Sequence, residues 1–148
     1  MKKSSTNLIE IRRGRHCVFN IHVHLVFVTK YRRRIFNQKI LNDIHPIFSS
    51  VCNDFNAKLI EFNGEYDHVH LLVNYPPKIA ISILVNSLKG VSSRMIRLKH
   101  PSLCNHYWYG ALWSPSYFAA SCGGAPISII RQYIESQQES KKRLISSS

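Results

Sequence analysis

Residues Lys58–Asn74, KLIEFNGEYDHVHLLVN, set the topology at the centre of the chain. Both halves are rich in β-branched, aromatic and other apolar residues, which predicts two strands, Lys58–Glu65 and His68–Asn74. Gly64-Glu65-Tyr66-Asp67 supplies a hairpin connection between them, and Pro76-Pro77 ends the second strand. The middle of the chain is therefore predicted to be an antiparallel pair of strands.

The segments before and after this pair read as a strand and two helices. Cys17–Thr29, CVFNIHVHLVFVT, contains no breaker and is apolar on both faces in its second half, which predicts a central strand. Apolar residues recur at helical spacing over Asn37–Phe55 and again over Ile79–Leu98. Pro46 lies inside the first of these two helices and is expected to kink or interrupt it.

A short fourth strand and a last helix complete the pattern. The strand is predicted over Tyr117–Cys122. Pro126 fits the first turn of a helix that ends near Ser140. The order of elements is that of an α+β, ferredoxin-like (RRM-like) fold, β-α-β-β-α-β, with an antiparallel sheet, helices on one face, and an added C-terminal helix that carries Tyr133. The prediction is one domain over residues 1–148, with a core at about 16–140 and flexible basic tails.

The charge balance points to a polyanionic partner. The chain has 20 Lys and Arg against 8 Asp and Glu, a net charge of +12, which favours nucleic acid. An acidic membrane surface is the competing reading, but no apolar run is long enough to span a bilayer. Met1–Arg15 lacks the apolar middle of a secretory signal, and the four cysteines match no zinc module, so we expect a cytoplasmic protein with reduced thiols.

His68-Val69-His70 is the first candidate for chemistry. Residues two apart in a strand face the same side, which places the two imidazoles about 6–7 Å apart at Cα, a suitable spacing for one divalent ion. Asp67 or Glu65 could orient a ligand histidine. The alternative is a pair of hydrogen-bonded or exposed histidines, because His22-Val23-His24 has the same form on the first strand.

The last helix holds a second candidate. Tyr133 and Gln137 are four residues apart, so they lie on one helical face and could place a hydroxyl and an amide oxygen in the same site. The alternative is that Tyr133 is a boundary aromatic with its hydroxyl in water.

Basic residues interleaved with aromatic ones form a third feature. Such a combination suits a surface for single-stranded nucleic acid, whereas the alternative is solvated charge. The candidate phosphate-binding residues are Lys30, Arg32, Arg33, Arg34, Lys89 and Arg94.

Five segments in register resemble the HUH-type, single-tyrosine transposases (TnpA-type) of small bacterial and archaeal insertion sequences. They are His24–Arg33 (HLVFVTKYRR), Glu65–Val73 (EYDHVHLLV), Leu88–Arg94 (LKGVSSR), Leu112–Ala119 (LWSPSYFA) and Gln132–Gln138 (QYIESQQ). Each segment is a weak signal by itself, but together they keep the order and spacing of the family over most of the chain. The departure is Cys122 and the Gly123–Pro126 turn before the last helix.

The resemblance assigns a role to each candidate. It implies that His68, His70 and Gln137 bind Mg²⁺ or Mn²⁺ and that Tyr133 is the nucleophile. It leaves His22 and His24 with a structural role. It implies that Tyr133 attacks single-stranded DNA beside hairpins at the ends of an insertion sequence and forms a 5′-phosphotyrosine. It also implies a homodimer with joined sheets, in which the tyrosine helix of one subunit can complete the metal site of the other.

Three rival functions compete with this interpretation. A domesticated HUH endonuclease associated with palindromic repeats would use the same residues on other DNA. A non-catalytic module for single-stranded nucleic acid would share the fold, but no RNP1-like segment is present. A phosphoesterase of the HxHxH kind would need a third histidine where this chain has Leu72.

Overall fold

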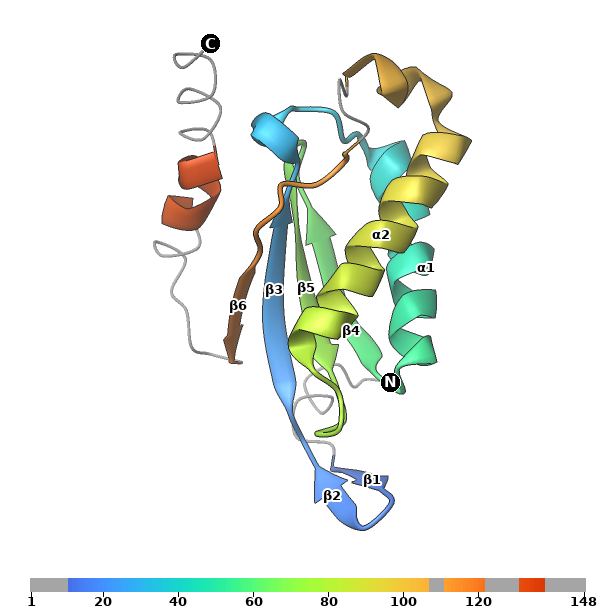
Figure 1. Cartoon of the computed structure of the whole chain (residues 1–148), viewed down its shortest axis with the longest axis vertical. Helices are drawn as coiled ribbons and strands as arrows, with labels where there is room; N and C mark the ends of the chain where they lie inside the picture. Colours follow the sequence, from blue (N-terminus) through green and yellow to red (C-terminus); the bar gives the residue numbers. More distant parts are fainter. Residues whose placement is uncertain (1–10, 107–110, 122–130, 138–148) are drawn as a thin grey trace.

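A computed structural model describes residues 11–106, 111–121 and 131–137 of the chain. Its main sheet is antiparallel throughout and has the strand order β4-β5-β3-β6. The four strands are β3 (His22–Val28), β4 (Lys58–Gly64), β5 (His68–Asn74) and β6 (Phe118–Ser121). Helices α1 (Gln38–Asp54) and α2 (Ile81–Lys99) cover one face of this sheet (Figure 1). The predicted α+β, ferredoxin-like order of elements is confirmed.

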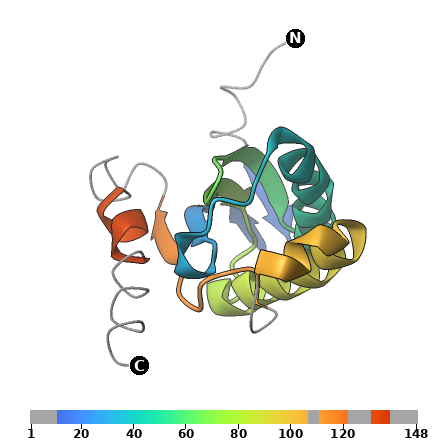
Figure 2. The same cartoon turned by 90° about the horizontal axis from the view of Figure 1, so that it is seen from above.

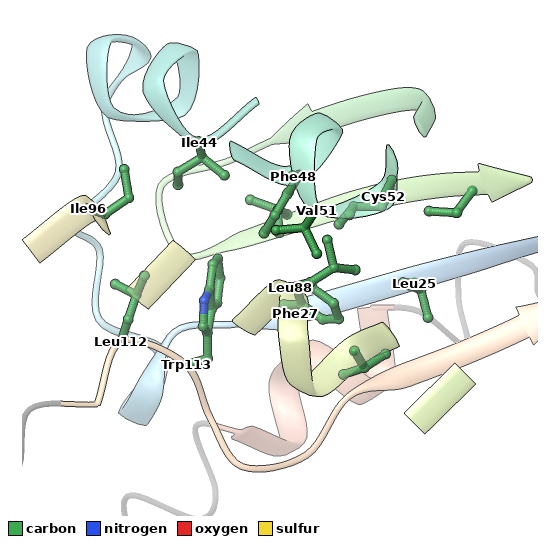
Figure 3. Packing of buried hydrophobic residues seen from close by; sticks show 14 of the residues in the cluster. Leu25, Phe27, Ile44, Phe48, Val51, Cys52, Leu88, Ile96, Leu112 and Trp113 are labelled. Atoms are coloured by element: carbon green, nitrogen blue, oxygen red, sulfur yellow. The ribbon is translucent and has the colours of Figure 1, made fainter. Parts of the chain in front are cut away.

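Alternation along the two central strands separates the faces of the sheet. Leu25 and Phe27 of β3 are fully buried in the core below the helices, as are Val69, Leu71 and Val73 of β5. The aromatic part of that core joins Phe27, Phe48 of α1 and Trp113 (Figure 3), with the Phe27 and Phe48 ring centroids 5.9 Å apart at 84°. The even-numbered residues of both strands point to the opposite face, where the histidines lie.

Helix α1 begins where Asn37 caps it: the Asn37 side chain accepts a hydrogen bond from the Ile40 N–H at 2.9 Å. The helix then continues through Pro46 without a break, so of the two expected effects, a kink or an interruption, the interruption does not occur. The buried stripe of this helix includes Ile44 and Phe48 on either side of Pro46. This packing outweighs the one backbone hydrogen bond that proline removes.

The N-terminal part of the chain differs from the prediction in two ways. Cys17–Thr29 is divided into β2 (Cys17–Phe19) and β3, and Arg12–Gly14, expected to be part of a loose tail, forms strand β1. β1 pairs with β2 in a two-stranded hairpin, with Gly14 opposite Cys17 and a two-residue turn in which His16 has φ 72°. The Arg12 guanidinium lies 4.9 Å from the centre of the Phe19 ring. This contact stabilises an arginine-rich strand that an apolar pattern could not predict.

A helix over residues 131–137 packs on the sheet face opposite α1 and α2 (Figures 1 and 2). Ile134 is buried there against Val26 and Val28, and Phe118 and Tyr133 pack around them. The predicted start of this helix at Pro126 and its end near Ser140 lie outside the described residues, as does Cys122. Within the described part of the chain, no helix is long and apolar enough to cross a membrane.

Candidate functional site

The two histidines of the HxH motif lie side by side at the start of β5. Their ring centroids are 4.9 Å apart with the ring planes at 76°, and both rings point away from the helical layer. Strand register places His68 opposite Val28 and His70 opposite Val26, so the pair lies beside the small apolar patch on which Ile134 packs. The expected geometry of the pair is therefore present in the structure.

Asp67 fixes the orientation of the first histidine. Its Oδ1 lies 2.6 Å from His68 Nδ1, and its Oδ2 accepts a hydrogen bond of 2.9 Å from Arg32 Nε. Burial alone would raise the pKa of Asp67, but the hydrogen bonds from His68 and Arg32 outweigh it and hold the pKa below its usual value. Of the two acidic residues proposed to orient a histidine, Asp67 does so, and His68 Nε2 is left to face a ligand.

His70 is neutral at physiological pH. Burial, together with the neighbouring rings of His68 and His24, lowers the pKa of His70 to about 4. A neutral imidazole has a lone pair to offer a metal ion. His24 stacks on His70 with ring centroids 5.6 Å apart, so the first strand contacts the site as well. His22 is buried and lies 3.3 Å from the Asn74 amide, which fits the structural role expected for it.

A pocket of about 450 Å³ opens beside the two histidines. Its wall carries charges of both signs from the β4–β5 turn, the segment after β3 and the helix at 131–137. The lining residues are Arg32, Glu65, Tyr66, Asp67, His68, His70, Arg131, Ile134 and Glu135. No group of three or more His, Cys, Asp or Glu side chains suited to a metal ion occurs among the described residues.

Tyr133 and Gln137 lie together, but they do not contact the histidines. The Tyr133 hydroxyl is 2.8 Å from Ser116 Oγ, and the Gln137 amide oxygen accepts a short hydrogen bond from Ser114 Oγ and one of 3.4 Å from Ser116 Oγ. Burial raises the pKa of Tyr133, and the hydrogen bond to Ser116 offsets only part of that rise. The phenol is therefore protonated in this position.

Lys89 of α2 holds the segment that contains Ser114 and Ser116, the two serines that contact Tyr133 and Gln137. The ammonium group donates hydrogen bonds of 2.7 Å to the carbonyl oxygens of Ser114 and Ser116 and lies near the Phe27 and Tyr117 rings. Burial lowers the pKa of Lys89 to about 8. Sequence reasoning placed Lys89 on a phosphate-binding surface, whereas in the structure its ammonium group bonds to its own chain.

The other basic candidates are divided between two places. Arg32 pairs with Asp67, Arg34 stacks 4.0 Å from the centre of the Tyr66 ring, and Lys30 and Arg33 flank the Tyr31 ring at 5.7 and 5.9 Å. These four follow β3 and lie at the histidine end of the sheet. Arg94 is exposed on α2, in the helical layer.

Sequence reasoning missed Ser114 and Ser116. Short polar side chains in an irregular segment carry no periodic signal, and only their place in the LWSPSYFA segment could have drawn attention to them. Their hydroxyls contact both residues proposed from the last helix, so they belong to the candidate site.

Comparisons with known proteins agree with this geometry. Residues 17–137 match the model of a family described as "Transposase IS200 like". The ISDra2 transposase TnpA of Deinococcus radiodurans is 31% identical over 131 residues, which cover 88% of this chain and 94% of the relative. The transposase for insertion sequence element IS200 of Salmonella typhimurium is 31% identical over 127 residues, covering 86% and 83%.

Two solved structures share the fold. A crystal structure of a Deinococcus radiodurans protein described as a transposase matches with a TM-score of 0.76 and 30% identity, over 85% of this chain and 97% of that one. A REP-associated tyrosine transposase bound to a REP hairpin matches with a TM-score of 0.53 and 12% identity, over 83% and 67%, and this shows a shared fold alone. With a family match over most of its length and a relative that it covers almost completely, the chain belongs to the IS200-like transposase family.

Proposed function

We propose that this protein cleaves and rejoins single-stranded DNA at the ends of an insertion sequence, with Tyr133 as the nucleophile. The observation that carries the proposal is the outward-facing pair His68 and His70, on the same sheet face as the helix that bears Tyr133. A transposase must break a phosphodiester bond and store its energy for rejoining, and a covalent bond to tyrosine does both.

The histidine pocket fits a divalent metal ion. Asp67 occupies Nδ1 of His68 and leaves Nε2 available, His70 is neutral, and Glu65, Asp67 and Glu135 give the pocket negative charge. We propose His68, His70 and the amide oxygen of Gln137 as the ligands of Mg²⁺ or Mn²⁺, with imidazole favouring Mn²⁺. When bound, such an ion polarises the scissile phosphate and neutralises the charge that develops on it.

The residues of the chain then perform the remaining steps. The Tyr133 oxygen forms a bond to phosphorus as the bond to the DNA 3′-oxygen breaks, which gives a 5′-phosphotyrosine and a free 3′-hydroxyl, and the phenol loses its proton. Because the Tyr133 hydroxyl contacts Ser116 and not the histidines, it would have to approach the histidine pocket to attack, and its raised pKa means that it does so as a protonated phenol. To hold such an ion, Gln137 would have to give up the hydrogen bond that it accepts from the Ser114 hydroxyl.

Hairpin DNA and a second copy of the chain complete the proposal. The REP-associated relative was solved with a hairpin bound, and the net charge of +12 suits such a ligand. A homodimer with joined sheets would let the tyrosine helix of one subunit serve the other. Insertion-sequence ends are preferred over chromosomal palindromes because the insertion-sequence relatives are 31% identical and the REP-associated protein is 12% identical.

A covalent-adduct assay tests the proposal. The protein is incubated with labelled hairpin DNA from an element end and with Mg²⁺, Mn²⁺ or EDTA, and the products are separated on denaturing gels. We expect a metal-dependent band heavier by one protein chain, absent in Tyr133→Phe and present in the control Tyr31→Phe. An adduct in Tyr133→Phe would identify another nucleophile. Binding without any adduct, under every metal, would favour a non-catalytic module.

A further inference from the structure

A second pocket, of about 350 Å³, lies at the end of the sheet away from the histidines. Its residues come from the β1–β2 hairpin, which lies at this end of the sheet in Figure 1, and from the turns after β5 and before β4. Its lining residues are Arg12, Arg13, Gly14, Arg15, Cys17, Phe19, Asn56, Pro76, Pro77 and Lys78. Four of these are basic, and no carboxylate lines the pocket in the part of the chain that the structure describes.

Arg12 gives the pocket a fixed wall. Its guanidinium donates hydrogen bonds to the Asn74 side-chain oxygen and, at 2.8 Å, to the Asn56 carbonyl oxygen, and it lies over the Phe19 ring. Asn74 is buried, and its amide also contacts His22. The hairpin is thereby fastened to the end of the sheet, so the cations that it carries have defined positions.

The other three cations are not neutralised. The side chains of Arg13, Arg15 and Lys78 form no hydrogen bond or ion pair with any other described residue, and Arg13 and Arg15 are exposed. Three unpaired positive charges around one concave surface, next to a fourth that is held in place, create a strong positive potential. A concave surface of this kind attracts a polyanion, whereas scattered surface charges would not concentrate the field in one place.

We propose that this pocket binds backbone phosphates of the DNA substrate, at a distance from the bond that is cut. The inference rests on the proposed action on DNA, but not on cleavage. The two pockets lie at opposite ends of β5. The histidine pocket is where His68 pairs with Val28, and the pocket at the β1–β2 hairpin lies beyond the pairing of Asn74 with His22. Six steps along a strand are about 20 Å, and the same distance spans about six base pairs of duplex DNA.

The phosphate pocket has a direct test in the salt dependence of DNA binding. The variant Arg13→Gln/Arg15→Gln/Lys78→Gln removes the three unpaired charges and leaves Arg12 in place. The control Lys39→Gln/Arg97→Gln/Lys99→Gln removes the same charge from the helical layer. For the pocket variant we expect affinity for a long element-end DNA to fall about tenfold or more near 0.15 M salt, with the slope of log Kobs against log salt smaller by about two to three.

Three DNA molecules are used to find out which phosphates the pocket binds. They also distinguish a failure of the phosphate pocket from a failure of the cleavage proposal. A hairpin and an unpaired strand of equal length distinguish a duplex stem from a single strand, and a loss with either supports the pocket. A short strand that carries only the cleavage site should form adduct equally with both variants. Equal losses of affinity in the pocket and control variants, or no loss in either, would overturn the inference. Absence of adduct even with the wild-type protein would overturn the cleavage proposal and leave the binding test intact.

A protection measurement requires no substitution. Cys17 lines the pocket and is partly exposed, so bound DNA should slow its alkylation. The rate is followed by peptide mass spectrometry, with buried Cys52 as the internal reference. Slower alkylation of Cys17 with long DNA, but not with the short strand, is the expected result. An unchanged rate at saturating long DNA would contradict the proposed site.

Discussion

The two ends of the sheet both carry arginines around a pocket, but the charges are compensated at one end and not at the other. At the histidine end, Arg32 is paired with Asp67, and Glu65 and Glu135 share the pocket wall. At the hairpin end, the described lining has four cations and no anion. Compensated charges hold side chains in position, whereas uncompensated charges attract a ligand from solution. We therefore expect the basic residues at the two ends of this small domain to serve different purposes.

The largest expected effect comes from removing a histidine. His68→Ala should reduce the rate of adduct formation about a thousandfold or more, because the ligand set for the ion would be broken. DNA affinity should change little, since the substitution does not alter the pocket at the β1–β2 hairpin. His16→Ala, at the tip of the β1–β2 hairpin, is the matched control and should leave the rate unchanged. Loss of binding and cleavage together in His68→Ala would show that the two ends do not act separately.

A smaller effect is expected from the carboxylate that orients His68. Asp67→Asn should weaken metal affinity about 10- to 100-fold, and excess Mn²⁺ should restore the rate of adduct formation. Asp43→Asn, which alters the carboxylate that contacts His100 between the two helices, should leave the metal dependence unchanged. Metal titrations of the adduct rate measure both variants. A loss that no metal concentration restores would mean that Asp67 acts in another way.

At Lys89 the positive charge is compensated by backbone carbonyl groups and not by a carboxylate, and a substitution there tests what this contributes to stability. Lys89→Met should lower the free energy of unfolding at pH 7.5 by about 1–2 kcal/mol, because two carbonyl oxygens lose their donor. The pKa of Lys89 is about 8 in the fold and higher in the unfolded chain, so the unfolded state binds more protons between these values. The stability of the wild type relative to the variant should therefore increase as pH rises above 8. Urea unfolding at several pH values measures it, with Lys39→Met as the control.

The smallest effect is expected at the hairpin. Arg12→Lys keeps the charge but cannot reach both Asn74 and Asn56, so the free energy of unfolding should fall by about 0.5–1.5 kcal/mol. Arg13→Lys should have almost no effect, since the Arg13 side chain forms no hydrogen bond or ion pair with another described residue. Thermal unfolding compares the two. Equal effects would mean that Arg12 does not fasten the hairpin.

Periodicity was sufficient to predict the elements that have a buried face. β5 and the HxH pair on its outer side follow from alternation, because Val69, Leu71 and Val73 must all enter the core. Strand β1 could not be predicted in this way, since Arg12 and Arg13 bury little. Both are held by pairing with β2, and Arg12 also by polar contacts. Pairing between segments depends on the assembled fold and leaves no local pattern.

The candidate site was predictable only in part for a similar reason. Tyr133 and Gln137 share a helical face, as their spacing indicated, but that spacing does not tell which neighbour they meet. Ile134 docks on Val26 and Val28 and thereby directs both side chains to Ser114 and Ser116 instead of the histidines. The role of His68, His70, Tyr133 and Gln137 in metal binding and cleavage stays a prediction.

The two faces of β3 have a consequence for the order in which parts of the molecule open. One face buries Leu25 and Phe27 in the main core, while the other offers only Val26 and Val28 to the helix at 131–137. Amide hydrogens in the centre of the sheet should therefore exchange with solvent only when the whole domain unfolds. Those of the described helix should exchange through a local opening of much lower free energy, which leaves the sheet and its paired histidines folded.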